Sequence, residues 1–93
     1  MIVGICTVEI FLHDGHSLKA KRQVLLSLKD RLREKFNLSV AEVGEQDLWQ
    51  KAMLGLACVA NERAYVNQVL EQALNLIRSV PTIEVVRSRI ELL

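Results

Sequence analysis

The order and character of its apolar segments constrain the fold of this 93-residue chain more than any other feature. Segments 2–12, 38–45, 51–60 and 82–92 have the composition of β-strands. A helical pattern lies between the first and second segments, and another between the third and fourth. The first and third strands are the most apolar, whereas the second and fourth carry charges. We therefore expect the first and third strands at the centre of a sheet and the other two at its edges.

Each helical pattern carries one apolar stripe at three- and four-residue spacing. Ser17 can cap the first helix, because its hydroxyl can accept a hydrogen bond from a first-turn amide, and this helix should end near Asn37. Asn61 is the expected cap of the second helix, which Pro81 ends. The stripes are Leu18, Val24, Leu25, Leu28, Leu32 and Phe36 in the first helix, and Val66, Val69, Leu70, Ala73, Leu74 and Ile77 in the second.

A β-α-β-β-α-β order with apolar first and third strands is the layout that a right-handed split βαβ arrangement requires. We therefore predict a single α+β domain over residues 1–93. Its expected form is a ferredoxin-like βαββαβ sandwich, with a four-stranded antiparallel sheet in the order 4-1-3-2 and both helices on one face. The pattern leaves open which sheet face meets the helices, because the last strand changes its apolar parity between Val85 and Val86.

Charge is distributed unevenly along the chain, although the formal net charge is only +1. Residues 17–36 hold seven basic and two acidic groups, and the rest of the chain holds five basic and nine acidic groups. The first helix is therefore a local positive element on an otherwise acidic protein.

The strongest functional signal lies at the start of this basic helix. Cations in a first helical turn oppose the helix dipole, and an anion bound there would reverse that penalty. The alternative is a solvated basic face whose lysine stems cover apolar surface. The residues predicted to contact an anion or RNA are His13, His16, Ser17, Lys19, Lys21, Arg22, Lys29, Arg31 and Arg33.

Catalysis and cofactor binding are not expected. Ser-His-Asp and Cys-His arrangements with supporting context are missing, and so are the cysteines of a ferredoxin cluster. His13, Asp14 and His16 offer only three metal ligands within one turn, so we interpret them as a turn rather than a metal site. Base stacking on the central strands, as in RNA-recognition motifs, is not expected either, because Phe11 is their only aromatic residue.

The aliphatic surplus of so small a chain favours a homodimer. A second copy would cover the open sheet face, and the predicted interface residues are Val3, Ile5, Trp49, Met53 and Val59. Cys6 and Cys58 lie in apolar runs and should be buried, reduced thiols. Segment 1–12 contains Glu9, lacks a basic region before its apolar run and is too short to span a bilayer, so we expect a cytoplasmic protein without membrane contact.

With these residues placed, the chain resembles the YlxP-like family of bacterial proteins, which carry a domain of unknown function numbered 503. The motifs are H-S-L-K-x-K-R at 16–22, F-N-L-S-V-A-E-V at 36–43, D-x-W-Q-x-A at 47–52, L-G-x-A at 54–57 and the ending I-E-L-L. The resemblance implies a ferredoxin-like domain with no catalytic residues to carry over and no cofactor. Family genes often lie near those for translation initiation and ribosome maturation, which implies a link to RNA or ribosomal particles.

Two hypotheses of different classes follow. In the first, the protein is a non-catalytic accessory factor of translation or ribosome maturation, and its basic first helix contacts RNA phosphates. In the second, it is a homodimeric interaction module without a role on nucleic acid. A domain that holds a small anionic ligand at the turn from His13 to Arg22 is a further alternative.

Overall fold

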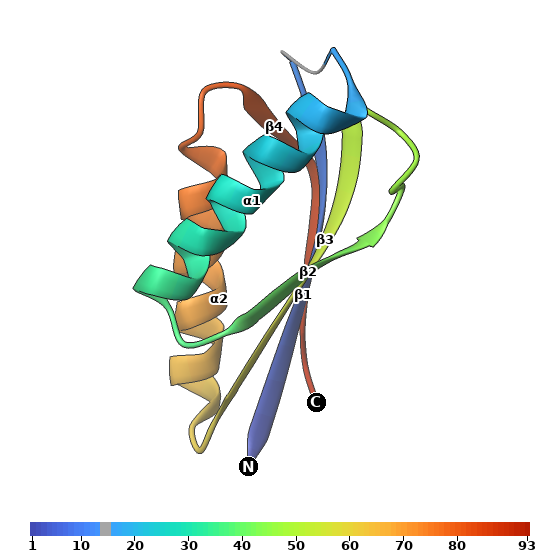
Figure 1. Cartoon of the computed structure of the whole chain (residues 1–93). Helices are drawn as coiled ribbons and strands as arrows, with labels where there is room; N and C mark the ends of the chain where they lie inside the picture. Colours follow the sequence, from blue (N-terminus) through green and yellow to red (C-terminus); the bar gives the residue numbers. More distant parts are fainter. Residues whose placement is uncertain (14–15) are drawn as a thin grey trace.

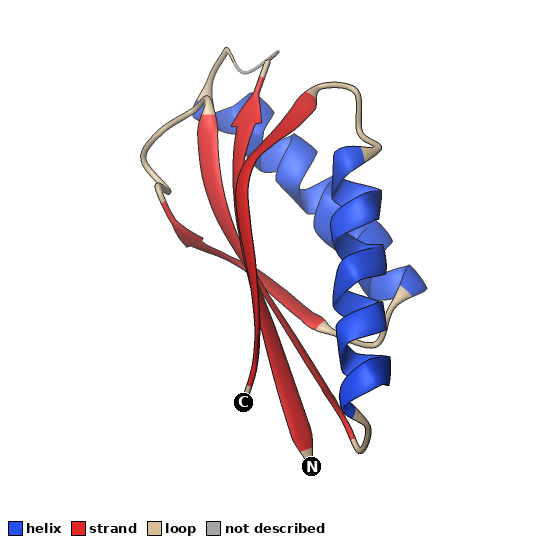
Figure 2. Ribbon diagram, turned by 180° about the vertical axis from the view of Figure 1, so that it is seen from behind, coloured by secondary structure: helices blue, strands red, loops and turns tan. Residues whose placement is uncertain are grey.

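The computed structural model describes residues 1–13 and 16–93. Its elements are β1 (Ile2–Leu12), α1 (Leu18–Lys35), β2 (Ser39–Gly44), β3 (Lys51–Ala60), α2 (Arg63–Arg78) and β4 (Ile83–Leu92) (Figure 1). All strand pairs are antiparallel, in the order β2-β3-β1-β4. The predicted element order, central strands and edge strands are confirmed. Both helices lie on the same side of the sheet (Figure 2).

The face of the sheet under the helices is the one that carries the even-numbered residues of β1. Cys6, Val8, Ile10 and Leu12 are buried there, and the odd-numbered residues of β1 lie on the opposite face, which no element of the described chain covers. We call this second surface the open face.

A β-bulge resolves the parity change in β4. Val85 pairs with Ile10 whereas Arg87 pairs with Glu9, so Val86 is an extra residue in the ladder. Because of this extra residue, Val85 before the bulge and Ile90 after it both face the helices. Val86 is left exposed.

The two helix starts differ. The Ser17 cap is confirmed, because its Oγ accepts a hydrogen bond from the Ala20 amide at 3.0 Å. The Asn61 cap is wrong: the capping position is Glu62, whose side chain makes no capping bond. The extended backbone continues to Glu62, so Asn61 lies one residue too early for its side chain to reach the amides of the first turn.

Helix α2 buries all six residues of its predicted stripe against β1, β3 and β4. Its close approach to the sheet depends on Gly4 of β1. A Cβ at this position would clash with Val66 Cγ1 and lie 2.9 Å from Leu70 Cδ1. Position 4 therefore requires glycine, because any larger side chain would prevent α2 from packing this close to the sheet.

Both cysteines lie in the core, as expected, and neither is in a disulfide. Burial raises the pKa of the Cys6 thiol, and Glu71 adds to this effect while Arg78 opposes it. Burial also raises the pKa of Cys58. A raised thiol pKa lowers the fraction of thiolate, which is the reactive form.

We predict that neither cysteine reacts with iodoacetamide at neutral pH in the folded protein. Both should be alkylated in denaturing urea, because unfolding restores access and an ordinary pKa. Mass spectrometry of the intact chain counts the adducts. Rapid modification of either thiol without denaturant would contradict the burial described here.

Candidate functional site

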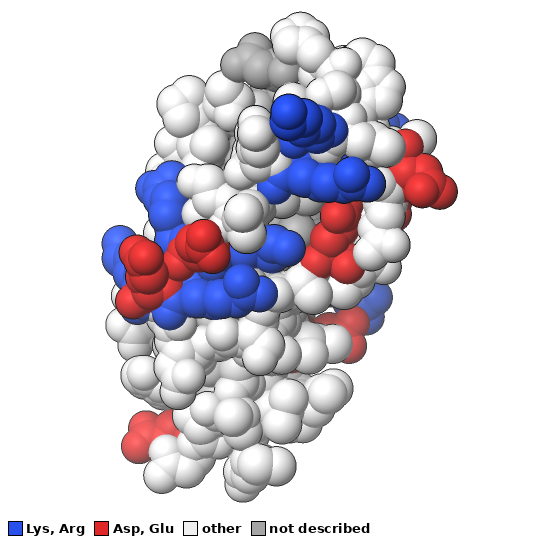
Figure 3. Space-filling view, in the orientation of Figure 1, with Lys and Arg blue, Asp and Glu red and all other residues white. Residues whose placement is uncertain are grey.

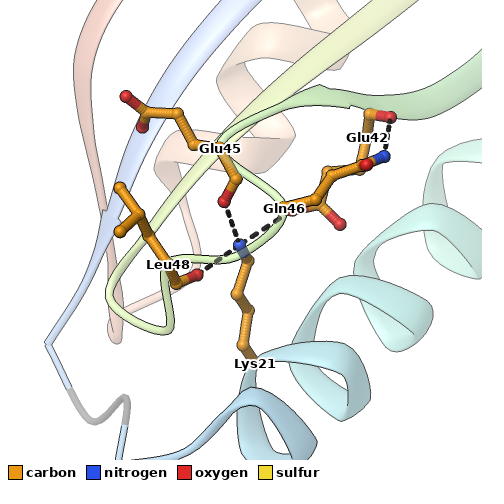
Figure 4. A network of polar contacts seen from close by, with 5 residues as sticks. All are labelled: Lys21, Glu42, Glu45, Gln46 and Leu48. Carbon is orange, nitrogen blue, oxygen red and sulfur yellow. Dashed lines mark hydrogen bonds and ion pairs between the residues drawn. The ribbon is translucent and has the colours of Figure 1, made fainter.

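Lys21 is the residue whose place in the structure differs most from its prediction. It was expected on an exposed anion-binding surface, but only 1% of its surface is exposed. Its Nζ lies 2.8 Å from Glu42 Oε2 and donates hydrogen bonds to the carbonyl oxygens of Glu45, at 2.8 Å, and of Leu48 (Figure 4). The ammonium therefore has one ion-pair partner and two hydrogen-bond acceptors within the chain. Lys21 is not available to an RNA phosphate.

The buried position of Lys21 follows from its spacing in the helix. Leu18, Lys21, Leu25, Leu28 and Leu32 recur every three or four residues, so Lys21 occupies a position of the stripe that faces the sheet. Glu42 pairs with Leu54 across β2 and β3 and therefore also points toward the helices. The helical spacing of Lys21 therefore indicated a buried position, although its charge had suggested an exposed one.

The contacts of Lys21 also fix the loop between β2 and β3. Glu45 has a φ of 58°, in the left-handed region that a residue with a side chain seldom occupies. This conformation turns its carbonyl toward Lys21 Nζ (Figure 4). One side chain thereby joins α1, the edge strand β2 and the following loop.

The remaining cations of α1 point outward. Lys19, Arg22 and Arg31 are exposed and Lys29 is half-buried. Arg33 is exposed but partly engaged, because its Nη2 donates to the Val40 carbonyl at 3.0 Å and its Nη1 lies 3.9 Å from Asp30. In the space-filling view, Lys and Arg side chains gather over α1, with a few acidic side chains among them (Figure 3).

The turn before α1 does not gather its predicted residues into one site. His13 Nε2 lies 3.0 Å from Glu84 Oε1 of β4, and its ring packs edge-on against Phe11. Ser17 uses its hydroxyl as the helix cap, and His16 is exposed. Residues 14 and 15, which complete the predicted turn, lie outside the described residues.

A groove of about 480 Å³ lies between α1 and the C-terminal half of α2. Two cations from α1, Arg31 and Lys35, line it together with the polar side chains Gln72, Asn75 and Ser79. Phe36 and Leu76 supply its apolar part. We call this hollow the interhelical groove.

Arg31 and Lys35 are the cations of α1 that line the groove, and neither has an ion-pair partner within 4 Å among the described residues. Lys19, Arg22 and Lys29 have no such partner there either, but they do not line the groove. Arg31 also lines two neighbouring hollows, one of which includes Glu34. Of the groove residues only Arg31 was predicted as a contact. Lys35 follows Arg31 by four residues and Asn75 follows Gln72 by three, so helical spacing was the available signal.

The residues predicted as an interface fall into two places. Val3, Ile5 and Met53 are half-buried on the open face, and Val59 is 53% exposed beside them. Trp49 is 43% exposed but lies in the loop between β2 and β3, outside the strands. The open face thus contains four of the five.

In the part of the chain that the structure describes, no helix is long and apolar enough to cross a membrane. Within residues 1–13 and 16–93, no group of three His, Cys, Asp or Glu side chains could hold a metal ion.

The fold and the groove together define an α+β sandwich with a basic first helix. Residues 3–90 match the family described as "Protein of unknown function (DUF503)". The chain is also 38% identical over 90 residues to the "Uncharacterized protein YlxP" of Bacillus subtilis (strain 168), covering 97% of this chain and 98% of that protein. The chain therefore belongs to the DUF503 family, and the resemblance found in its motifs is confirmed.

We predict that Lys21→Met lowers the free energy of unfolding by about 3 kcal/mol, the low end for breaking a buried ion pair, because Glu42 remains 18% exposed. The methionine keeps the apolar stem but leaves two carbonyls and a carboxylate without their donor. Urea unfolding followed by circular dichroism measures the change. Lys19→Met, on the exposed side of the same turn, is the matched control and should change stability by less than about 0.5 kcal/mol. Equal effects of the two substitutions would contradict the structural role of Lys21.

Proposed function

We propose that this protein is a non-catalytic, cytoplasmic accessory factor of translation or ribosome maturation that binds RNA through α1 and the interhelical groove. We also assign its sandwich to the ferredoxin-like class, on the basis of its element order and strand order. The observation that carries the RNA proposal is one groove that brings together three polar side chains and two cations, Arg31 and Lys35, which have no acidic partner within 4 Å among the described residues.

The charge that remains on the surface supports this proposal. With Lys21 neutralised by Glu42, α1 still presents six cations against Asp30 and Glu34. The six are Lys19, Arg22, Lys29, Arg31, Arg33 and Lys35. A positive helix on a chain of net charge +1 attracts polyanions locally, without attracting them over the whole surface.

The lining of the interhelical groove suits RNA more than an isolated anion. Arg31 and Lys35 would contact phosphates, which fixes position without reading sequence. Gln72 and Asn75 carry both hydrogen-bond donors and acceptors, the groups that pair with base edges and ribose hydroxyls. Because bases are accessible in single strands and loops, we propose single-stranded RNA as the ligand.

The proposal predicts binding of a single-stranded ribo-oligonucleotide that weakens with salt. Arg31→Gln combined with Lys35→Gln should remove two phosphate contacts and reduce the slope of log affinity against log salt by about 1.4, since each contact on a single strand contributes about 0.7. Fluorescence anisotropy at several salt concentrations measures the slope.

A matched control distinguishes the effect of the groove residues from the effect of the change in net charge. Arg63→Gln combined with Lys51→Gln makes the same change of charge at the start of α2 and at the start of β3, away from the groove, and should leave the slope almost unchanged. Equal loss in both double variants, or no salt-dependent binding by the original protein, would contradict the proposal. Binding of a mononucleotide without binding of the oligonucleotide would instead assign the groove to a small anionic ligand.

A further inference from the structure

The open face has an apolar part and a charged part that the strand register places side by side. Across one row, Ala57 of β3 pairs with Ile5 of β1, which pairs with Glu91 of β4. In the next row Thr7 lies between Gly55 and Arg89. In these two rows the uncharged residues lie on β1 and β3 and the charged residues on β4, whereas in the following row Glu9 of β1 is also charged.

The apolar part continues onto β2. A Cβ at Gly55 would stand 3.0 Å from Val43 Cγ1, so the absence of a side chain at Gly55 makes room for Val43, which is 58% exposed. Val59 and Met53 extend the same surface along β3. Exposed aliphatic side chains grouped on one side of a sheet are the usual sign of an interface rather than of a solvated surface.

The charges lie where the rim of an interface would be. Glu9 of β1 and Arg87 of β4 are neighbours in the strand register. Arg89 Nε lies 2.8 Å from Glu91 Oε1. With Thr7 and Met53 these four residues surround a hollow of about 260 Å³. The rim therefore contains two acids and two arginines, and its formal charge is balanced.

We propose that the open face is the interface of a homodimer, in which a second copy of this chain packs its own open face against the first. A two-fold axis that runs across the strands near Thr7 would place β1 and β3 of the two copies against each other and β4 against β4 at one edge of the interface. This arrangement has the apolar core and polar rim of stable interfaces.

Two observations favour a second copy over another partner. A balanced rim is complementary to itself, because the arginines of one copy can pair with the acids of the other. A chain of net charge +1 repels its own copies only weakly.

Sedimentation across the micromolar range tests the proposal. The protein should sediment as a dimer, and Met53→Asp should raise the dissociation constant at least about tenfold, because it replaces an apolar contact of the interface with a second carboxylate beside Glu9. Leu26→Asp, at an exposed position on α1, is the control and should leave the dimer unchanged. A monomer at every concentration, or a Met53→Asp variant that dimerises like the original protein, would overturn the proposal.

Cross-linking tests the geometry without disturbing the core. Packed sheets lie about 10 Å apart, so a short bismaleimide should link two copies of Thr7→Cys near the axis. Gln68→Cys, on the exposed side of α2, should give no linked dimer. The buried native thiols should not compete with the added ones. Linkage through Gln68→Cys but not through Thr7→Cys would show that a different surface forms the dimer.

Discussion

The ammonium group of Lys21 lies where three parts of the chain meet: the start of α1, the edge strand β2 and the loop that leads into β3. Helix α2 packs on three strands through its apolar stripe, whereas α1 packs mainly on β2 and α2. A charged pair with two further hydrogen bonds therefore adds polar contacts of defined geometry to the apolar contacts of α1. The left-handed conformation of Glu45 turns its carbonyl toward the Lys21 ammonium.

The burial of Lys21 reduces the number of α1 cations that are available to a ligand. Lys21 is structural, and Arg33 is partly engaged by Val40 of β2 and by Asp30. Among the cations of α1, Arg31 and Lys35 share the interhelical groove with polar side chains of α2. The groove residues belong to the helices, which lie on the opposite side of the sheet from the open face, so the proposed RNA binding and the proposed dimerisation would use different surfaces. A dimer would present two grooves.

The sequence predicted the architecture well, because hydrophobic patterns report burial directly. The strand order, the edge strands and the entire stripe of α2 followed from those patterns. The details that it missed depend on register. The bulge at Val86 and the pairing of Glu42 with Leu54 are set by how strands align, which the pattern within a single strand does not contain. Lys21 was predicted to be exposed because of its charge, although its spacing matched the buried stripe. The groove position of Gln72 and Asn75 depends on how α1 packs beside α2, which the pattern of either helix alone does not contain.

Nuclear magnetic resonance would test the central claim, which is that the described cations of α1 divide between a structural role and a binding role. Titration of ¹⁵N-labelled protein with a single-stranded ribo-oligonucleotide should shift the side-chain amides of Gln72 and Asn75 and the backbone amides near Arg31 and Lys35. The ammonium signal of Lys21 should be protected from exchange and unaffected by RNA. Shifts centred on Thr7 and Met53 of the open face, or a Lys21 signal that responds to RNA, would contradict the account.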